Sequence, residues 1–164
     1  MNIGKEIALE AKKYELCQPW SKRMLKITQF KDLVDMYFKG DDWSMKNDFP
    51  RIDTLRKYKG AILPYHLYVD DNGHHKNLSL GAFFGTSKAS LSFNDYDVSK
   101  LIVRHNSKLT IVASGRAIVN ISLLDGAEVQ IDCIDDAKVL VFDYGKNTRI
   151  ICKGQVKIIE SNFD

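Results

Sequence analysis

The chain has 164 residues, 45% of them hydrophobic and 27% charged, and its formal net charge is +3. These values are ordinary for one soluble globular domain, or one domain with an appendage, and they exclude a disordered chain. No stretch approaches the roughly 20 consecutive apolar residues of a membrane-spanning helix. Charged residues near the N-terminus argue against a signal peptide, so we expect a cytoplasmic protein without membrane contact.

Residues 1–60 have the spacing of short amphipathic helices, with apolar residues three or four apart. Gly40 ends one helix, and Phe49-Pro50 ends the turn after it. The predicted helices cover residues 3–14, 19–26, 29–39 and 52–58, with a short turn before residue 47. Helices this short bury little surface alone. We therefore expect residues 1–60 to pack on the β region of residues 61–164, so that the whole chain unfolds as one cooperative unit.

The next segment has the pattern of two strands joined by a turn. Residues 61–69 and 78–84 are strand-like, and the intervening Asp70-Asp71-Asn72-Gly73 contains the strongest short hairpin signal, Asn-Gly. This predicts a β-hairpin between the two segments.

From Ser87 to the end, the chain repeats the motif small-x-apolar-x-apolar. The clearest copies begin at Ala117, Ala127 and Ala137, and turn residues such as Asp125-Gly126 separate them. Alternation with period two is typical of strands with one buried face. The sequence therefore predicts consecutive strands with a repeat of about ten residues.

Two architectures fit this repeat. One is a β-solenoid with two strands and twenty residues per coil, whose coils must stack to bury their apolar rows. The other is an antiparallel β-sandwich or barrel. Copies that begin at Ser87, Ser99 and Ser107 are twelve and then eight residues apart, which again sums to twenty. The constant sum favours an α+β protein with short N-terminal helices and a two-strand-per-coil β-solenoid.

Clustered acidic residues raise the possibility of carbohydrate chemistry, which solenoid enzymes perform with carboxylates on a sheet face. The candidates are Asp125, Asp132, Asp135, Asp136 and Asp143. Only Asp132 has a clear outward position, whereas aspartate in turns is common for backbone reasons. The adjacent His74 and His75 would point to opposite faces of a strand, which disfavours a shared metal ion. We therefore predict no catalytic, cofactor or metal site.

Two surface features remain. Apolar residues interrupt the polar outward positions and predict a surface for self-association or for a protein partner: Ile102, Ile118, Leu140 and Phe142. Basic residues on consecutive strands form a possible patch for an anionic ligand, including nucleic acid: Lys100, Arg104 and Lys108.

Several segments carry a resemblance to a known group of proteins. They are Cys17-Gln-Pro-Trp20, the pattern from Leu33 through Tyr37 and Gly40 to Asp42-Trp43, Asp48-Phe49-Pro50, Tyr96-Asp-Val-Ser99 and Val103-Arg-His-Asn-Ser107. In these the chain resembles an uncharacterised family of gut anaerobic bacteria and of their prophages and mobile elements. The resemblance implies a context, an accessory protein of a phage or mobile element. It implies no activity and no functional residue.

These observations favour a non-enzymatic structural or protein-interaction module that forms a homo-oligomer or binds another protein. One alternative is a carbohydrate-active or carbohydrate-binding solenoid that uses outward aspartates. The other is a small nucleic-acid-binding regulator that uses the basic residues 1–60, where thirteen Lys/Arg face nine Asp/Glu. Nucleic acid is not the favoured partner, since a weakly basic helical face is usually only solvated.

Overall fold

The computed structural model describes residues 2–163, which divide into two compact units. The first is helical and ends at Tyr65, and Phe163 groups with it. The second is the β unit, from His66 to Asn162. The boundary lies five residues beyond the expected one, because residues 59–65 are helical rather than strand-like.

The helical unit contains six α-helices and two 3-10 helices among its described residues. They are α1 (Ile3–Ala11), η1 (Lys12–Tyr14), α2 (Gln18–Leu25), α3 (Phe30–Lys39), α4 (Asp41–Asn47), α5 (Ile52–Lys57), α6 (Lys59–Ile62) and η2 (Leu63–Tyr65). Helices α1, α2 and α3 and two residues outside the helices, Ile27 and Phe49, form one buried cluster: Ile7, Ala8, Ala11, Met24, Ile27, Met36 and Phe49. The helices therefore have a core of their own. Cooperative unfolding of the whole chain stays a prediction.

Contacts distant in sequence hold α1 in this unit. A side chain on Gly4 would lie 2.2 Å from the Met24 carbonyl oxygen, so only glycine permits this approach of α1 to α2. On α1, the Glu6 carboxylate accepts hydrogen bonds from the Lys57 ammonium group, at 2.7 Å, and from the Tyr58 hydroxyl. These hydrogen bonds lower the pKa of Glu6, and the one from Lys57 has the larger effect.

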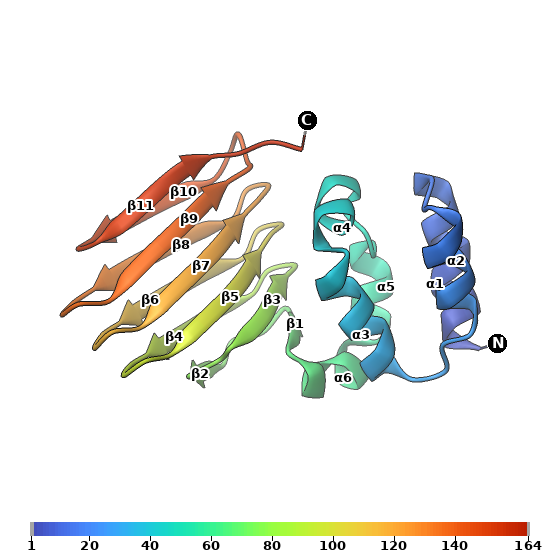
Figure 1. The fold of residues 1–164 in the computed structure, drawn as a ribbon, viewed down its shortest axis with the longest axis horizontal. Helices are drawn as coiled ribbons and strands as arrows, with labels where there is room; N and C mark the ends of the chain where they lie inside the picture. The colour runs from blue at the N-terminus through green and yellow to red at the C-terminus, as the bar shows by residue number, and fades with distance from the viewer. Residues whose placement is uncertain (1, 164) are drawn as a thin grey trace. The chain divides into compact units, whose positions relative to one another are not determined.

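The β unit is a solenoid of about four turns in which consecutive strands alternate between two sheets (Figure 1). The six-stranded sheet comprises, in order, β1 (Leu67–Val69), β3 (Leu80–Phe84), β5 (Val98–Val103), β7 (Ile118–Leu123), β9 (Lys138–Asp143) and β11 (Val156–Glu160). The five-stranded sheet comprises β2 (His74–Lys76), β4 (Lys88–Phe93), β6 (Lys108–Ala113), β8 (Glu128–Cys133) and β10 (Arg149–Lys153). Every strand pair is parallel. This confirms the predicted solenoid and rules out the antiparallel alternative.

The coil length is more regular than the sequence motif indicated. The strand starts run in steps of ten residues from Lys88 to Lys138. Ser99 pairs with Val119, and not with the start of the next motif at Ala117. The predicted steps of twelve and eight residues are therefore wrong. They result from treating Ser99, which lies inside β5, as equivalent to Ser87 and Ser107, which directly precede β4 and β6.

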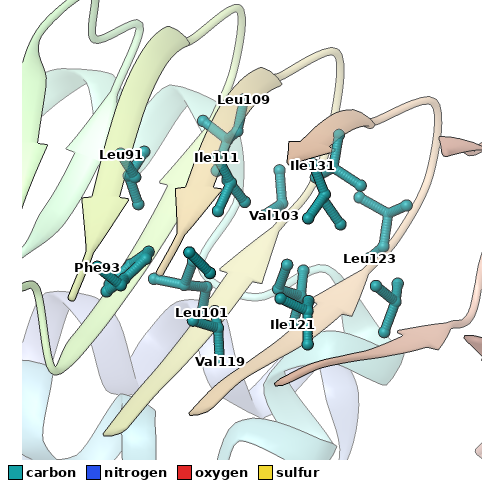
Figure 2. Close-up of a cluster of buried hydrophobic side chains, with 14 of the residues drawn as sticks. Leu91, Phe93, Leu101, Val103, Leu109, Ile111, Val119, Ile121, Leu123 and Ile131 are labelled. Atoms are coloured by element: carbon teal, nitrogen blue, oxygen red, sulfur yellow. The ribbon is translucent and has the colours of Figure 1, made fainter. Parts of the chain in front are cut away.

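Inward side chains of both sheets meet in one continuous apolar core (Figure 2). Each coil contributes three inward positions from each strand, as in Leu101, Val103, Leu109 and Ile111. These side chains are at most 2% exposed. Stacking places identical positions of successive coils in contact, so a coil is stabilised by the neighbours that cover its apolar row.

The turns of successive coils also stack, through residues in the left-handed backbone region. At one corner these are Gly85, His105 and Asp125, each twenty residues from the next. The Nδ1 atom of His105 accepts a hydrogen bond from the Gly85 N–H at 3.0 Å, and the Asp125 carboxylate accepts one from the His105 N–H at 2.9 Å. At the other corner Asp135 accepts from the Gly115 N–H at 3.0 Å. Side-chain acceptors in the turns thus satisfy backbone donors of the preceding coil.

The solenoid begins earlier than predicted. The predicted hairpin at Asn72-Gly73 is wrong, because β1 pairs with β3 and β2 pairs with β4, in different sheets. The turn at Asp70–Gly73 is instead the first corner of the solenoid. Its strands of three residues are too short to show the repeat in sequence.

Candidate functional site

The four apolar residues predicted to form an interaction surface all lie on strands of the six-stranded sheet and face outward. Ile118 is 44% exposed, and Leu140 and Phe142 are half-buried. Ile102, between Ala82 and Ser122 in register, is fully buried and offers no accessible surface. The exposed part of this surface is therefore the beginning and middle of the strands.

We call the outward side of these strands the lysine–aliphatic face. Its members are Val98, Lys100, Ile102, Ile118, Asn120, Ser122, Lys138, Leu140, Phe142, Lys157 and Ile159. None of these described residues is acidic. Val98 and Ile118 are adjacent in register and are 62% and 44% exposed. A solvated sheet face normally carries polar side chains, so adjacent exposed aliphatic side chains are the unusual feature.

The opposite, five-stranded sheet has a more ordinary outer face. Its exposed aliphatic side chains, Val112 and Ile151, lie on β6 and β10, which β8 separates. Both carboxylates of its outer face, Glu128 and Asp132, are on that intervening strand. The two faces of the solenoid therefore differ in chemistry.

The three basic residues predicted to form a patch do not share a surface. Lys100 is on the six-stranded sheet, whereas Lys108 is on the five-stranded sheet. Arg104 is 3% exposed, and its Nε atom donates to the Asp125 carboxylate at 3.0 Å. The reason is topological: consecutive strands of a two-strand coil lie in opposite sheets.

A groove lies where three stacked turns meet the beginning of the lysine–aliphatic face. We call it the corner groove; its lining is Arg116, Ile118, Asp136, Lys138 and Gln155. Ile118 and Lys138 are paired in register. Within residues 2–163, no ion pair or hydrogen bond joins the side chains of Arg116, Asp136 and Lys138. The groove therefore offers two cations and one carboxylate beside an aliphatic side chain.

Tyr96 lies beside this groove in the preceding turn. The Arg116 guanidinium lies 5.8 Å from the centroid of the Tyr96 ring, within cation–π range. Tyr96 is 74% exposed. This contact orients Arg116 while leaving the edge of its guanidinium available to a ligand.

Sequence reasoning missed Arg116 and Lys138 as a pair. The signal for them is the twenty-residue register, which places Lys138 directly beside Ile118. The motif copies that begin at Ala117 and Ala137 already carry that register.

The acidic cluster is dispersed, and most of its members serve the turns. Asp125 and Asp135 accept backbone hydrogen bonds of the preceding coil. Asp143 accepts from the Thr148 hydroxyl at 2.6 Å. The outward Asp132 shares its face with Glu128, four residues away on the same strand, or about 13 Å at about 3.3 Å per residue. Paired glycosidase carboxylates stand roughly 5–9.5 Å apart.

Histidine contacts that the sequence did not reveal occur at the first coil. The ring of His75 points inward and its Nε2 atom lies 2.8 Å from the Asp71 carboxylate. The same ring packs against Tyr68, with 4.3 Å between ring centroids. His74, in contrast, is exposed on the outer side of β2. The two adjacent histidines face opposite sides, as the alternation predicted.

No protein-family model, curated protein or solved structure matches this chain. Among residues 2–163, no helix has the length and apolar character needed to cross a membrane. The candidate site therefore stands on geometry alone.

Proposed function

We propose that the chain is a non-enzymatic protein-interaction module whose contact surface is the lysine–aliphatic face. The observation that carries this proposal is the pair of exposed aliphatic side chains, Val98 and Ile118, in register on a sheet face without a carboxylate. Burying such a patch against a partner is favourable by about 25 cal/mol per Å² of apolar surface. Extended repeat surfaces serve this role in other solenoids. The proposed context is that of an accessory protein of a phage or mobile element.

The alternative functions have weaker support. Carbohydrate hydrolysis needs two convergent carboxylates, and the outward pair of Glu128 and Asp132 is too widely spaced. Nucleic-acid binding through the predicted basic patch would need Lys100, Arg104 and Lys108 on one face, and they are separated.

Photo-cross-linking in the native cell tests this proposal. Benzoylphenylalanine replaces Ile118 on the lysine–aliphatic face or, as a matched control, Thr110 on the exposed face of the five-stranded sheet. We expect a discrete protein adduct from position 118 and none from position 110. Equal adducts from both positions, or none from position 118, would refute the proposal.

A further inference from the structure

We infer that the corner groove binds an acidic segment of a protein partner, with a carboxylate of that segment at Arg116 and Lys138 and an apolar side chain on Ile118. This inference rests on the proposed function and adds the chemistry of the ligand.

Charge points to an anionic ligand. Arg116 and Lys138 line the groove and have no ion-pair partner among the described residues, and Lys157 lies on the adjoining face. The one carboxylate of the groove is Asp136, so its lining has a net charge of +1. A guanidinium presents a planar fork of donors that matches a carboxylate.

Aliphatic neighbours indicate that the ligand is not purely ionic. Ile118 lines the groove, and Val98 lies beside Ile118 in register at 62% exposure. An anionic group next to an apolar group would satisfy both parts of this surface. Acidic amphipathic polypeptide has that composition.

Asp136 and Gln155 favour polypeptide over a phosphodiester. Polypeptide supplies backbone N–H donors for the Asp136 carboxylate, and the Gln155 amide can both donate to and accept from a peptide backbone. A phosphodiester chain has no backbone donor for Asp136 and is repelled by it. Asp136 therefore acts against nucleic acid and anionic lipid.

Symmetry disfavours a second copy as the occupant. In a two-fold dimer the same patch of each subunit meets, so the lysine rows of the two copies would face each other. Lys138 and Lys157 belong to these rows, and none of the described members of the face is acidic. An acidic partner has the complementary charge.

Fluorescence anisotropy with the full chain tests this inference. The probe is a labelled peptide of alternating Asp, Leu, Glu and Ile, and the control peptide has Asn and Gln in place of the acids. We expect saturable binding of the acidic peptide alone. An exposed ion pair contributes about 0.2–1 kcal/mol, so removing two should weaken binding by roughly 2- to 30-fold in the Arg116→Gln/Lys138→Gln variant. The matched Lys108→Gln variant, on the other sheet, should bind like the wild type.

Two further probes distinguish the ligand classes: an oligo-dT strand and phosphatidylserine vesicles. Asp136→Asn removes a charge that repels every anion but keeps an acceptor oxygen for a peptide N–H, so we expect it to strengthen both phosphate probes more than the acidic peptide. Tighter binding of either phosphate probe than of the peptide to the wild-type groove would overturn the inference. So would equal losses in the Lys108→Gln and groove variants, which would indicate diffuse electrostatic attraction. Loss of peptide specificity with intact cross-linking at position 118 would refute the acidic ligand and leave the proposed function standing.

Discussion

Truncation of one core residue, with a control on the same strand, tests the inward–outward assignment of the solenoid. Val129 on β8 is fully buried between Leu109 and Ile150, its register neighbours, whereas the adjacent Gln130 is exposed. Removing one buried carbon atom, as in Ile→Val, costs about 0.5–1.5 kcal/mol. Val129→Ala removes two, so we expect a loss of about 2 kcal/mol in the free energy of unfolding. Gln130→Ala should change it by less than about 0.5 kcal/mol.

The assay is denaturant unfolding followed by two signals. Both tryptophans, Trp20 and Trp43, belong to the helical unit, so their fluorescence reports that unit. Far-UV circular dichroism at the β signal reports the solenoid. A loss for Gln130→Ala equal to that for Val129→Ala would refute the facing of β8. Coincident transitions of the two signals would support unfolding of the chain as one unit, and separate transitions would contradict it.

The remaining predictions concern backbone strain, thiol reactivity, pH and mass. Gly154 has φ +91°, and an added Cβ would lie 1.8 Å from the Cys133 carbonyl oxygen, so Gly154→Ala should cost more than about 2 kcal/mol by denaturation, whereas Gly60→Ala, with open space around it, should be neutral or slightly stabilising. Burial raises the pKa of the Cys133 thiol, so alkylation monitored by mass spectrometry should label the two exposed cysteines first; equal rates would contradict its burial. The lowered pKa of Glu6 contributes stability above the pKa of the unfolded chain, and that contribution is lost as pH falls through the folded value. Tryptophan-detected unfolding of Glu6→Gln should therefore show lower stability at neutral pH and a smaller loss on acidification than the wild type; parallel pH profiles would contradict this. Light scattering of the chain alone should give the monomer mass of 18.7 kDa, and a dimer would contradict the argument that lysine rows repel each other.

The solenoid could be predicted from the sequence because its physical cause is local and repeated. Alternation of apolar and polar residues marks each strand, and turns at a constant interval allow coils to stack. The first coil was missed because its strands are only three residues long and its turn carries Asn-Gly, which elsewhere closes hairpins. Which strands pair depends on tertiary packing, and the residues of a single turn do not determine it.

The candidate surface was only partly predictable. Alternation identified Ile118, Leu140 and Phe142 as outward, but it carried no information on whether the surface there is accessible, as the burial of Ile102 shows. The basic patch failed for a different reason. Consecutive strands lie in opposite sheets. Residues on neighbouring strands of one sheet are therefore about twenty apart in sequence, as Ile118 and Lys138 are.

A nuclear magnetic resonance titration tests most directly whether the lysine–aliphatic face contacts polypeptide. The isotope-labelled full chain is titrated with the acidic amphipathic peptide, and shifts of the backbone amides are mapped on the strands. We expect the largest shifts at Arg116, Ile118 and Lys138 and along the start of β5, with the amides of β4 and β6 unchanged. Shifts concentrated on β4, β6 and β8, or within the helical unit, would contradict the assignment of this face as the contact surface.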